Sequence, residues 1–431
     1  FILPEIVSVM EKSQDIVIRA HYKGTFVISG PAGSGKTTLA LHRVAYLAQS
    51  PDSAHLYPHN TIIVFVQDNT TKDYFSHLLP ELGINNVKIT TFFDWAKDIL
   101  KLTDITYLTS VNEDYLYEYE KIKTLRCGTH AKWNKNIFTM LESFYAKNLS
   151  KEKLNSFLKQ KQEKKLDHLD ITIALRSFFH EQGKFQVTRE YNAVKDGQLK
   201  RMKEKTILAY SLMVIDEFQN YLPEQLSILK TCISDVTNSL IYVGDTAQQV
   251  RLGTAESLEQ VDKYTPPERQ VKLEKVYRST KQILEYIKSL GYVIEIPAKL
   301  KEGKKVVETI LSSKNDIENQ VKMLTENFSG NIIGIICIHQ SDVPHLKELF
   351  KYDHRVHVCS MIESQGVEFE LVCLVGIQQN TLLKNNNHYF SGDLFKEIKK
   401  IQRDLLYVAL TRAAEEMHIV GTYTLKEWLS N

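Results

Sequence analysis

The chain has 431 residues, 43% of them hydrophobic and 25% charged, which is typical of a soluble protein with about three domains. Its net charge of +2 excludes a global field that would draw the whole protein to nucleic acid, so any such surface must be a local basic patch. Five scattered cysteines without a C-x-x-C pair argue against a zinc or iron–sulfur site and suit the cytoplasm, and no apolar run is long enough to span a membrane.

The first predicted elements surround a glycine-rich loop. Residues 25–29 (TFVIS) are predicted to form a buried parallel strand, and residues 38–48 (TLALHRVAYLA) have helical spacing. Between them, residues 30–37 read GPAGSGKT, which fits the P-loop pattern G-x-x-x-x-G-K-[ST]. Such a loop points backbone N–H groups at phosphate oxygens, while Lys36 reaches the β and γ phosphates of ATP and Thr37 binds Mg²⁺. No signal peptide is visible, and because the sequence begins with Phe1 instead of Met we expect a preceding segment.

Further strands are predicted at residues 61–67, 87–91, 212–216 and 240–243, with helical segments between several of them. This alternation is typical of a doubly wound α/β sheet. Residues 213–219 (MVIDEFQ) form an apolar strand that ends in two carboxylates. Behind a P-loop, Asp216 is the predicted Mg²⁺ ligand and Glu217 the predicted base that orients the attacking water.

The aromatic residues after the third strand leave two interpretations open. Phe92, Phe93 and Trp95 could line a nucleic-acid groove or pack in the core. Asn69 is a further groove candidate, and it serves equally well as a turn residue.

Residues 100–205 differ from their surroundings and are predicted to form an all-helical insertion. Seven lysines fall between residues 147 and 166. They suit a solvated helix face; the alternative is a surface for nucleic acid or for a protein partner. A boundary is predicted at residues 264–267 (YTPP), because paired prolines stop regular structure. A second series of strands follows at residues 331–337, 356–360, 371–375 and 417–420, which predicts a second α/β domain.

Together these motifs resemble superfamily 1 helicases of the UvrD/Rep type. The sequence DEFQ is similar to the DExQ box of that family, and other motifs follow in the family's order. They are Gln14 upstream of the P-loop, TTFFDW at 90–95, VGDTAQ at 243–248, LEKVYRS at 273–279, SQGVEF at 364–369 and LYVALTRA at 406–413.

The resemblance implies two tandem RecA-like P-loop NTPase domains, with ATP and Mg²⁺ bound between them and a helical insertion in the first. The domains would be residues 1–99 with 206–264, the insertion 100–205, and the second domain 265–431. The implied activity is ATP hydrolysis that drives movement along single-stranded DNA or RNA. The implied catalytic residues are Lys36, Glu217, Gln248, Arg278 and Arg412, and the Mg²⁺ ligands are Thr37 and Asp216. The implied nucleotide-binding residues are Gln14, Gly30, Ala32, Gly33, Ser34, Gly35, Lys36, Thr37, Thr38, Tyr277, Gly366 and Glu368.

Three departures point within the superfamily toward HelD-like proteins. No aromatic residue follows Gln248, Gln365 replaces a usual lysine, and the spacing from Arg278 to Gly366 is too short for the large UvrD-type insertion. HelD-like proteins use ATP to remodel or release RNA polymerase. Three hypotheses are therefore open: a nucleic-acid translocase or helicase, an ATPase that acts on RNA polymerase, and an ATP-binding subunit of a larger complex.

Overall fold

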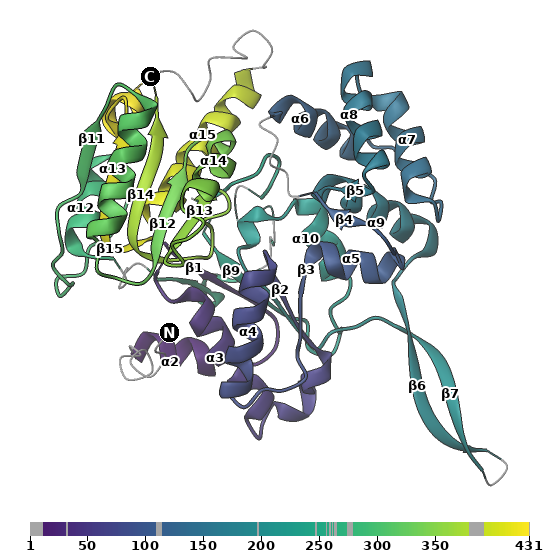
Figure 1. Ribbon diagram of the computed structural model, residues 1–431. Helices are drawn as coiled ribbons and strands as arrows, with labels where there is room; N and C mark the ends of the chain where they lie inside the picture. The colour runs from purple at the N-terminus through teal and green to yellow at the C-terminus, as the bar shows by residue number, and fades with distance from the viewer. Residues whose placement is uncertain are drawn as a thin grey trace. The chain divides into compact units, whose positions relative to one another are not determined.

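The computed structural model describes residues 12–31, 33–108, 114–195, 198–245, 248–255, 257, 260, 262, 265–273, 279–378 and 392–430 (Figure 1). Its contacts divide the chain into two compact units. Unit 1 comprises Phe1–Ile28, Thr37–Gly244 and Gly253–Val271, and unit 2 comprises Ser29–Lys36, Asp245–Leu252 and Lys272–Asn431. The helices of the described part of the chain include none that is long and apolar enough to cross a membrane.

Unit 1 is built on a six-stranded sheet in the order β10-β1-β9-β8-β2-β3, in which β9, β8, β2 and β3 pair in parallel. Its strands are β1 (Thr25–Ser29), β2 (Ile62–Val66), β3 (Lys88–Thr91), β8 (Leu212–Ile215), β9 (Ser239–Gly244) and β10 (Gln270–Lys272). The strands predicted from apolar runs are all present. Every residue of β2, β8 and β9 is buried, which explains why their sequences are continuously apolar instead of alternating.

Helices follow most strands of this sheet, as expected for a doubly wound arrangement. They are α2 (Lys12–Arg19), α3 (Lys36–Gln49), α4 (Asn69–Glu81), α5 (Phe92–Leu100) and α10 (Pro223–Lys230). Local capping sets two of the starts: the Asp68 side chain accepts from the Thr71 amide, and Thr91 accepts from the Asp94 amide. Phe92, Phe93 and Trp95 of α5 are buried, and Trp95 packs edge-on against Phe65. Of the two interpretations, these three aromatics fit core packing.

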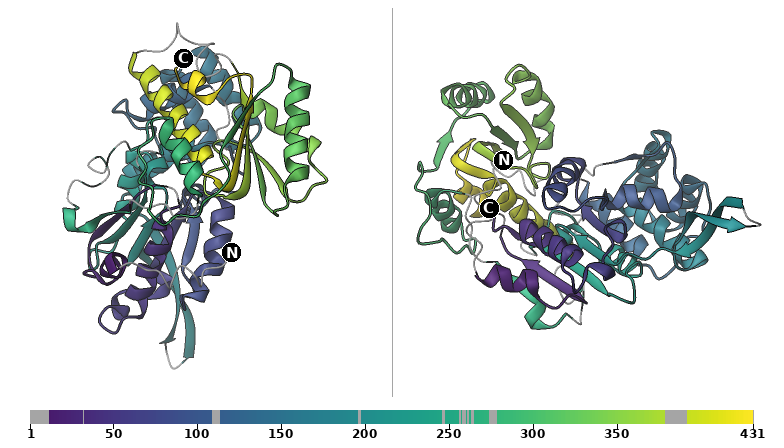
Figure 2. Two further views of the ribbon diagram at one scale, coloured as in Figure 1. Left: turned by 90° about the vertical axis from the view of Figure 1, so that its left-hand side faces the viewer. Right: turned by 90° about the horizontal axis from the view of Figure 1, so that it is seen from below.

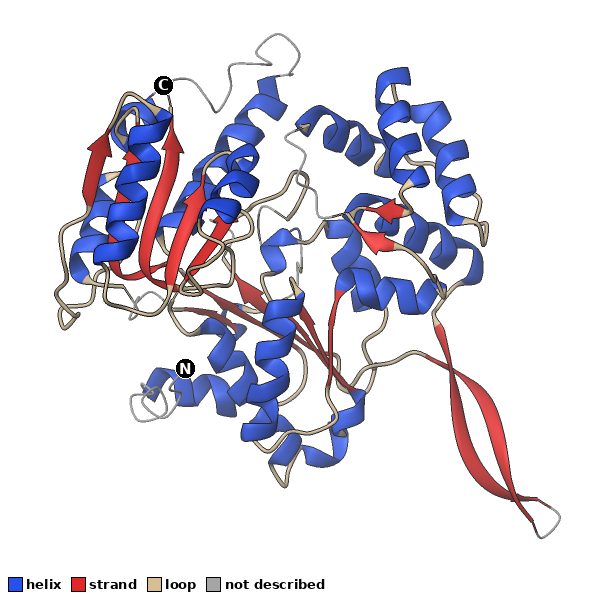
Figure 3. Cartoon of the chain, in the orientation of Figure 1, coloured by secondary structure: helices blue, strands red, loops and turns tan. Residues whose placement is uncertain are grey.

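The segment between β3 and β8 is only partly helical. It contains α6 (Tyr115–Leu125), α7 (Ile137–Asn148), α8 (Lys151–Gln162), α9 (His168–Gln182) and the short pair β4 (Thr106–Tyr107) and β5 (Lys165–Leu166). It also contains a long antiparallel hairpin of β6 (Gln186–Lys195) and β7 (Gln198–Ile207), which Figure 3 shows as a separate red ribbon. The prediction of an all-helical segment is therefore wrong. The described side chains at 186–188 and 201–207 are exposed or half-buried, so no buried apolar run marks these segments as strands in the sequence.

A buried ion cluster holds the helices of this segment together. The Lys121 side chain is fully buried on α6, and its ammonium lies 2.6 Å from Asp167 and 2.8 Å from Asp170. Burial alone would lower the pKa of Lys121, but the two carboxylates raise it overall, so the side chain stays charged. Asp170 accepts from the Tyr145 hydroxyl over 2.6 Å and from the Gln160 side-chain amide over 3.0 Å, so both oxygens of this carboxylate have a donor.

Unit 2 carries a five-stranded, all-parallel sheet in the order β11-β15-β14-β12-β13. Its strands are β11 (Val307–Ile310), β12 (Ile333–Cys337), β13 (Val356–Ser360), β14 (Phe369–Ile377) and β15 (Ala413–Gly421), and its helices are α12 (Lys281–Ser289), α13 (Lys314–Asn327), α14 (Val343–Leu349), α15 (Gly392–Leu410) and α16 (Leu425–Ser430). The core lies between α13, α14 and the sheet, around Val321, Ile335 and Cys373. Figure 2 shows this sheet edge-on and from below. Four of the five strands were predicted, whereas β11, which is half exposed, was not.

Candidate nucleotide site

The P-loop joins β1 to α3, and its shape depends on glycine. Gly30 has φ 149°, and a Cβ built on it would lie 2.2 Å from the carbonyl oxygen of Leu273. Gly33 and Gly35 have φ of 73° and 83°, a region that other residues avoid. Of the predicted loop residues, Ala32 lies outside the described residues.

Polar groups of the loop are suited to bind an anion. Lys36 is 7% exposed, and its ammonium donates to the Pro31 carbonyl over 2.9 Å. The Ser34 hydroxyl is buried and has no hydrogen-bond partner within the described structure. An ammonium has three donors, and a buried hydroxyl without a partner costs free energy, so both groups favour an acceptor such as a phosphate oxygen. Thr37 and Thr38 lie half-buried in the first turn of α3, where the helix N-terminus also favours an anion.

The two predicted Mg²⁺ ligands contact each other directly. The Thr37 hydroxyl donates to the Asp216 carboxylate over 3.1 Å, although 179 residues separate them. Asp216 lies at the end of β8, is 5% exposed, and its amide donates to Phe65 of β2. Magnesium prefers a few oxygen ligands and keeps several waters, so a hydroxyl and one carboxylate beside a phosphate site suit it. Among the described residues, no cluster of three His, Cys, Asp or Glu side chains competes as a metal site.

Glu217 is held in an unusual backbone conformation. Its φ of 50° and ψ of 47° are left-handed, which is uncommon for a residue other than glycine and occurs at functional sites. The side-chain amide of Gln219, which is fully buried, donates to the Glu217 carboxylate over 2.6 Å. Gln67, the residue after β2, lies 3.4 Å from the carbonyl oxygens of Asp216 and Glu217.

Gly244 at the end of β9 leaves space for this arrangement. A Cβ on Gly244 would lie 2.1 Å from the Gln219 side-chain oxygen and 2.9 Å from the Phe218 ring. Our sequence analysis did not assign Gln67, Gln219 or Gly244 to the site. The available signals were the Gln of DEFQ, the polar end of the second strand and the Gly of VGDTAQ.

Arg43 connects α3 to the end of α2, the helix that carries Gln14. The guanidinium is 2% exposed and donates to the carbonyl oxygens of Val17, Ile18, Ala20 and His21. These are carbonyls at the end of a helix, which lack partners within the helix. Burial lowers the pKa of Arg43 to about 10, which still leaves it charged at neutral pH. Arg43 therefore fixes the position of α2, which carries Gln14, one of the implied nucleotide-binding residues.

The segment after β9 is attached to α15. Gln248 is 2% exposed and donates to the Asp245 carboxylate over 2.7 Å. The Gln249 amide donates to Asp404 over 3.2 Å, and Lys400 binds both the Gln249 side chain and, over 3.1 Å, Asp404. Burial raises the pKa of Asp404 to about 6 despite the opposing effect of Lys400.

Arg412 is bound to the backbone of its own unit. It is 6% exposed, and its guanidinium donates to Val408 over 2.9 Å and to Val367 over 3.3 Å. The Phe369 amide in turn donates to the Arg412 carbonyl, so the two predicted motifs at 364–369 and 406–413 lie together. Gly366 has φ 82° and is exposed, and Glu368 is half-buried. Tyr277 and Arg278 lie outside the described residues, as do the side chains of Gln14 and Asn69.

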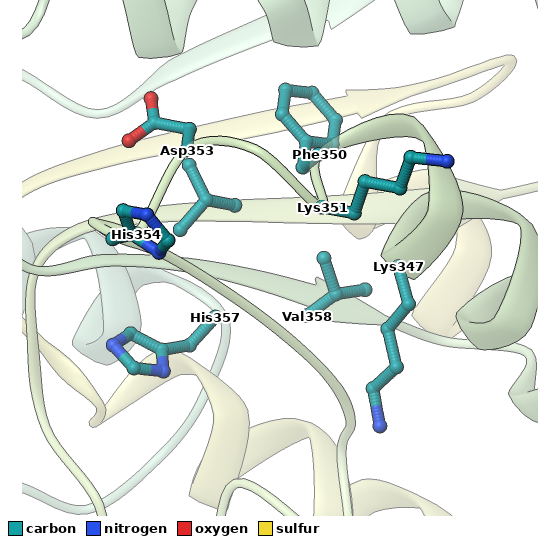
Figure 4. Close-up of a pocket in the computed structure, with 8 residues that line it drawn as sticks. Lys347, Phe350, Lys351, Asp353, His354, His357 and Val358 are labelled. Carbon is teal, nitrogen blue, oxygen red and sulfur yellow. The ribbon is translucent and has the colours of Figure 1, made fainter.

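A separate hollow of about 450 Å³ lies beside β13 and α14 (Figure 4). It is lined by Lys347, Phe350, Lys351, Asp353, His354, Val356, His357 and Val358, none of which belongs to the predicted site.

Known protein families match most of the chain. Residues 13–254 match the family described as an AAA domain, and residues 156–421 match the viral superfamily 1 RNA helicase core domain. The chain belongs to superfamily 1 of the helicases. The two matches together cover the P-loop, the Asp216–Glu217 pair and the Arg412 motif of the chain. The finer UvrD/Rep-like or HelD-like assignment does not follow from it.

Solved structures similar to this helicase include two of viral origin. One is the helicase of PRRSV (TM-score 0.40, 12% identity, 96% of this chain covered), and the other is arterivirus nonstructural protein 10, a helicase (TM-score 0.39, 14% identity, 97% covered). The chain spans 56% and 63% of the lengths of those two proteins. No curated protein matches it in sequence.

Proposed function

We propose that this helicase is an ATP-driven motor that moves along single-stranded nucleic acid, with RNA as its substrate. The observation that carries the proposal is the contact of Thr37 with Asp216 behind a glycine-dependent P-loop, with Glu217 oriented beside it. We also infer that the two parallel sheets belong to tandem RecA-like domains with the predicted boundaries.

The side chains at the site have complementary tasks. Lys36 and the loop amides would bind phosphate oxygens, while Thr37 and Asp216 would hold Mg²⁺. ATP with Mg²⁺, when bound, supplies the phosphoryl group that is transferred to water. Glu217 orients that water and accepts its proton, and Gln219 holds the carboxylate in place, because a hydrogen bond to a charged group is stronger than one between neutral groups. The implied catalytic roles of Gln248, Arg278 and Arg412 stay predictions.

RNA is preferred to DNA on one ground: the family that matches residues 156–421 is described as an RNA helicase core. A UvrD-like preference for DNA and a HelD-like action on RNA polymerase are the competing hypotheses, which were predicted from sequence motifs alone.

The test is the rate of ATP hydrolysis without addition, with single-stranded RNA, with single-stranded DNA and with RNA polymerase. Lys36→Ala is the blank. We expect stimulation by RNA well above that by DNA, with loss of activity in Glu217→Gln and retention of ATP binding, because this substitution removes the base but no phosphate contact. Equal stimulation by both strands would contradict the RNA assignment. If RNA polymerase alone stimulated ATP hydrolysis, the result would contradict the proposed motor and favour the HelD-like function.

A further inference from the structure

The hairpin β6–β7 is a two-stranded ribbon without a third strand. Its ten residue pairs run from Gln186↔Ile207 to Lys195↔Gln198, and no other strand of the described residues joins it. At about 3.4 Å per residue, the ribbon is roughly 30 Å long. Figures 1 and 3 show it extending away from the rest of unit 1. Isolated two-stranded ribbons are marginally stable in water, so a ribbon of this length is a structure that a binding partner would stabilise.

The base of the ribbon is firmly anchored. Phe185, the residue before β6, is 3% exposed and packs against Trp95 with ring centroids 5.7 Å apart. The Leu208 amide after β7 donates to the Phe185 carbonyl over 2.8 Å. A load on the ribbon is therefore transmitted to α5 and its neighbours.

Positive charge is concentrated on the ribbon. Residues 186–207 contain six basic and three acidic side chains, a net charge of +3, whereas the whole chain carries only +2. The remaining 409 residues are thus net negative by one charge. This is the local basic patch that composition alone requires of a chain that binds nucleic acid.

Three of the cations share one face of β7. Arg201, Lys203 and Lys205 are exposed, and alternate residues of a strand point to the same side. Neighbouring members of this row are roughly 6.8 Å apart along the strand. A row of evenly spaced cations along one strand suits the successive phosphates of an extended single strand.

We propose that the face of β7 formed by Arg201, Lys203 and Lys205 binds the sugar–phosphate backbone of single-stranded RNA, outside the nucleotide site. The inference rests on the proposed function, because that function supplies the polyanion. Contacts of this kind position the strand without reading its sequence. They would hold RNA on the protein while the nucleotide site cycles.

The test is the affinity for poly(U), measured by fluorescence anisotropy without ATP over a series of salt concentrations. Each lost phosphate contact lowers the magnitude of the slope of log K against log [salt] by about 0.7 for a single strand. The variant Arg201→Gln/Lys203→Gln/Lys205→Gln should therefore lower the slope by about 2 and weaken binding about tenfold to a hundredfold near 0.1 M salt. The charge-conserving variant Arg201→Lys/Lys203→Arg/Lys205→Arg should retain wild-type binding, which separates charge from folding.

A matched control removes the same charge elsewhere. Lys147, Lys151 and Lys159 are exposed on α7 and α8, and their replacement by glutamine should leave the slope unchanged. The proposal would be overturned if this control lost as much RNA affinity as the hairpin variant, or if the hairpin variant kept the wild-type salt slope. A loss of affinity for duplex RNA alone would overturn the assignment to a single strand. Failure of the proposed function would give a different result. Poly(U) would then bind the wild type with a steeper salt slope than the hairpin variant, but it would not stimulate ATP hydrolysis.

Discussion

Replacement of Gly244 by alanine tests how Glu217 is held. The added Cβ would meet the Gln219 side-chain oxygen at 2.1 Å and the Phe218 backbone nitrogen at 3.1 Å. The Gln219 amide is the movable partner, but it is fully buried and donates to the Glu217 carboxylate. Relief of the clash therefore requires that hydrogen bond to break.

Two magnitudes follow from this geometry. Overpacking of a buried site costs about 1–3 kcal/mol of unfolding free energy, which lowers Tm by about 2–4 °C per kcal/mol in a unit of this size. A hydrogen bond to a charged group contributes about 1.5–3 kcal/mol. If that contribution orients Glu217 in the transition state, kcat should fall about tenfold to a hundredfold while KM for ATP changes little.

The assay is steady-state ATP hydrolysis with saturating RNA, together with thermal unfolding. Gly392→Ala is the matched control, because a Cβ at Gly392, the first residue of α15, has nothing within 4 Å. In a Gln219→Ala background, Gly244→Ala should cost less stability than in the wild type, since the closest contact is gone. An unchanged kcat in Gly244→Ala would refute the role of Gln219 in holding Glu217.

Three further substitutions test other parts of the structure. Arg43→Lys should raise KM for ATP about tenfold with little change in kcat, because one ammonium cannot bond four carbonyls. Arg19→Lys, on the exposed side of α2, is the control. Equal KM values for the two variants would contradict the link between Arg43 and Gln14. Asp404→Asn should flatten the pH dependence of stability. A folded pKa of about 6 against an ordinary 3.8 means that the unfolding free energy of the wild type falls by about 3 kcal/mol as the pH rises from about 4 to 7. Urea unfolding of both proteins over this pH range measures the difference. Lys121→Met should lower the unfolding free energy by about 3–5 kcal/mol by leaving two buried carboxylates uncompensated, and a loss below about 1 kcal/mol in chemical unfolding would show that the cluster is not needed.

The sequence predicted the elements whose residues are buried throughout. Strands such as β2 and β12 are continuous apolar runs. The residues at which such strands end determine which carboxylates lie beside the P-loop. The contact of Thr37 with Asp216 follows from two motifs of known chemistry. The β6–β7 hairpin could not be predicted in this way, because its described residues at 186–188 and 201–207 include none that is buried.

The supporting residues of the site were missed for another reason. Asp404 binds the Gln249 amide across 155 residues of sequence, and no local pattern connects the two. Arg43 lies in a helical stretch where an arginine normally suggests a solvated face, yet it is almost completely buried. Gly244 belongs to the VGDTAQ motif, but the space that it leaves for Gln219 becomes visible only in the structure.

The chain leaves the first sheet after β3 and returns to it at β8, and both strands are neighbours of β2. The intervening helices and hairpin can therefore be lengthened, shortened or exchanged without a change in strand register or in the position of Asp216. Domains inserted between closely spaced chain ends are tolerated for the same reason. The proposed contacts of this segment with RNA can thus vary independently of the proposed chemistry at the nucleotide site, and replacement of the segment by a short linker would test that independence.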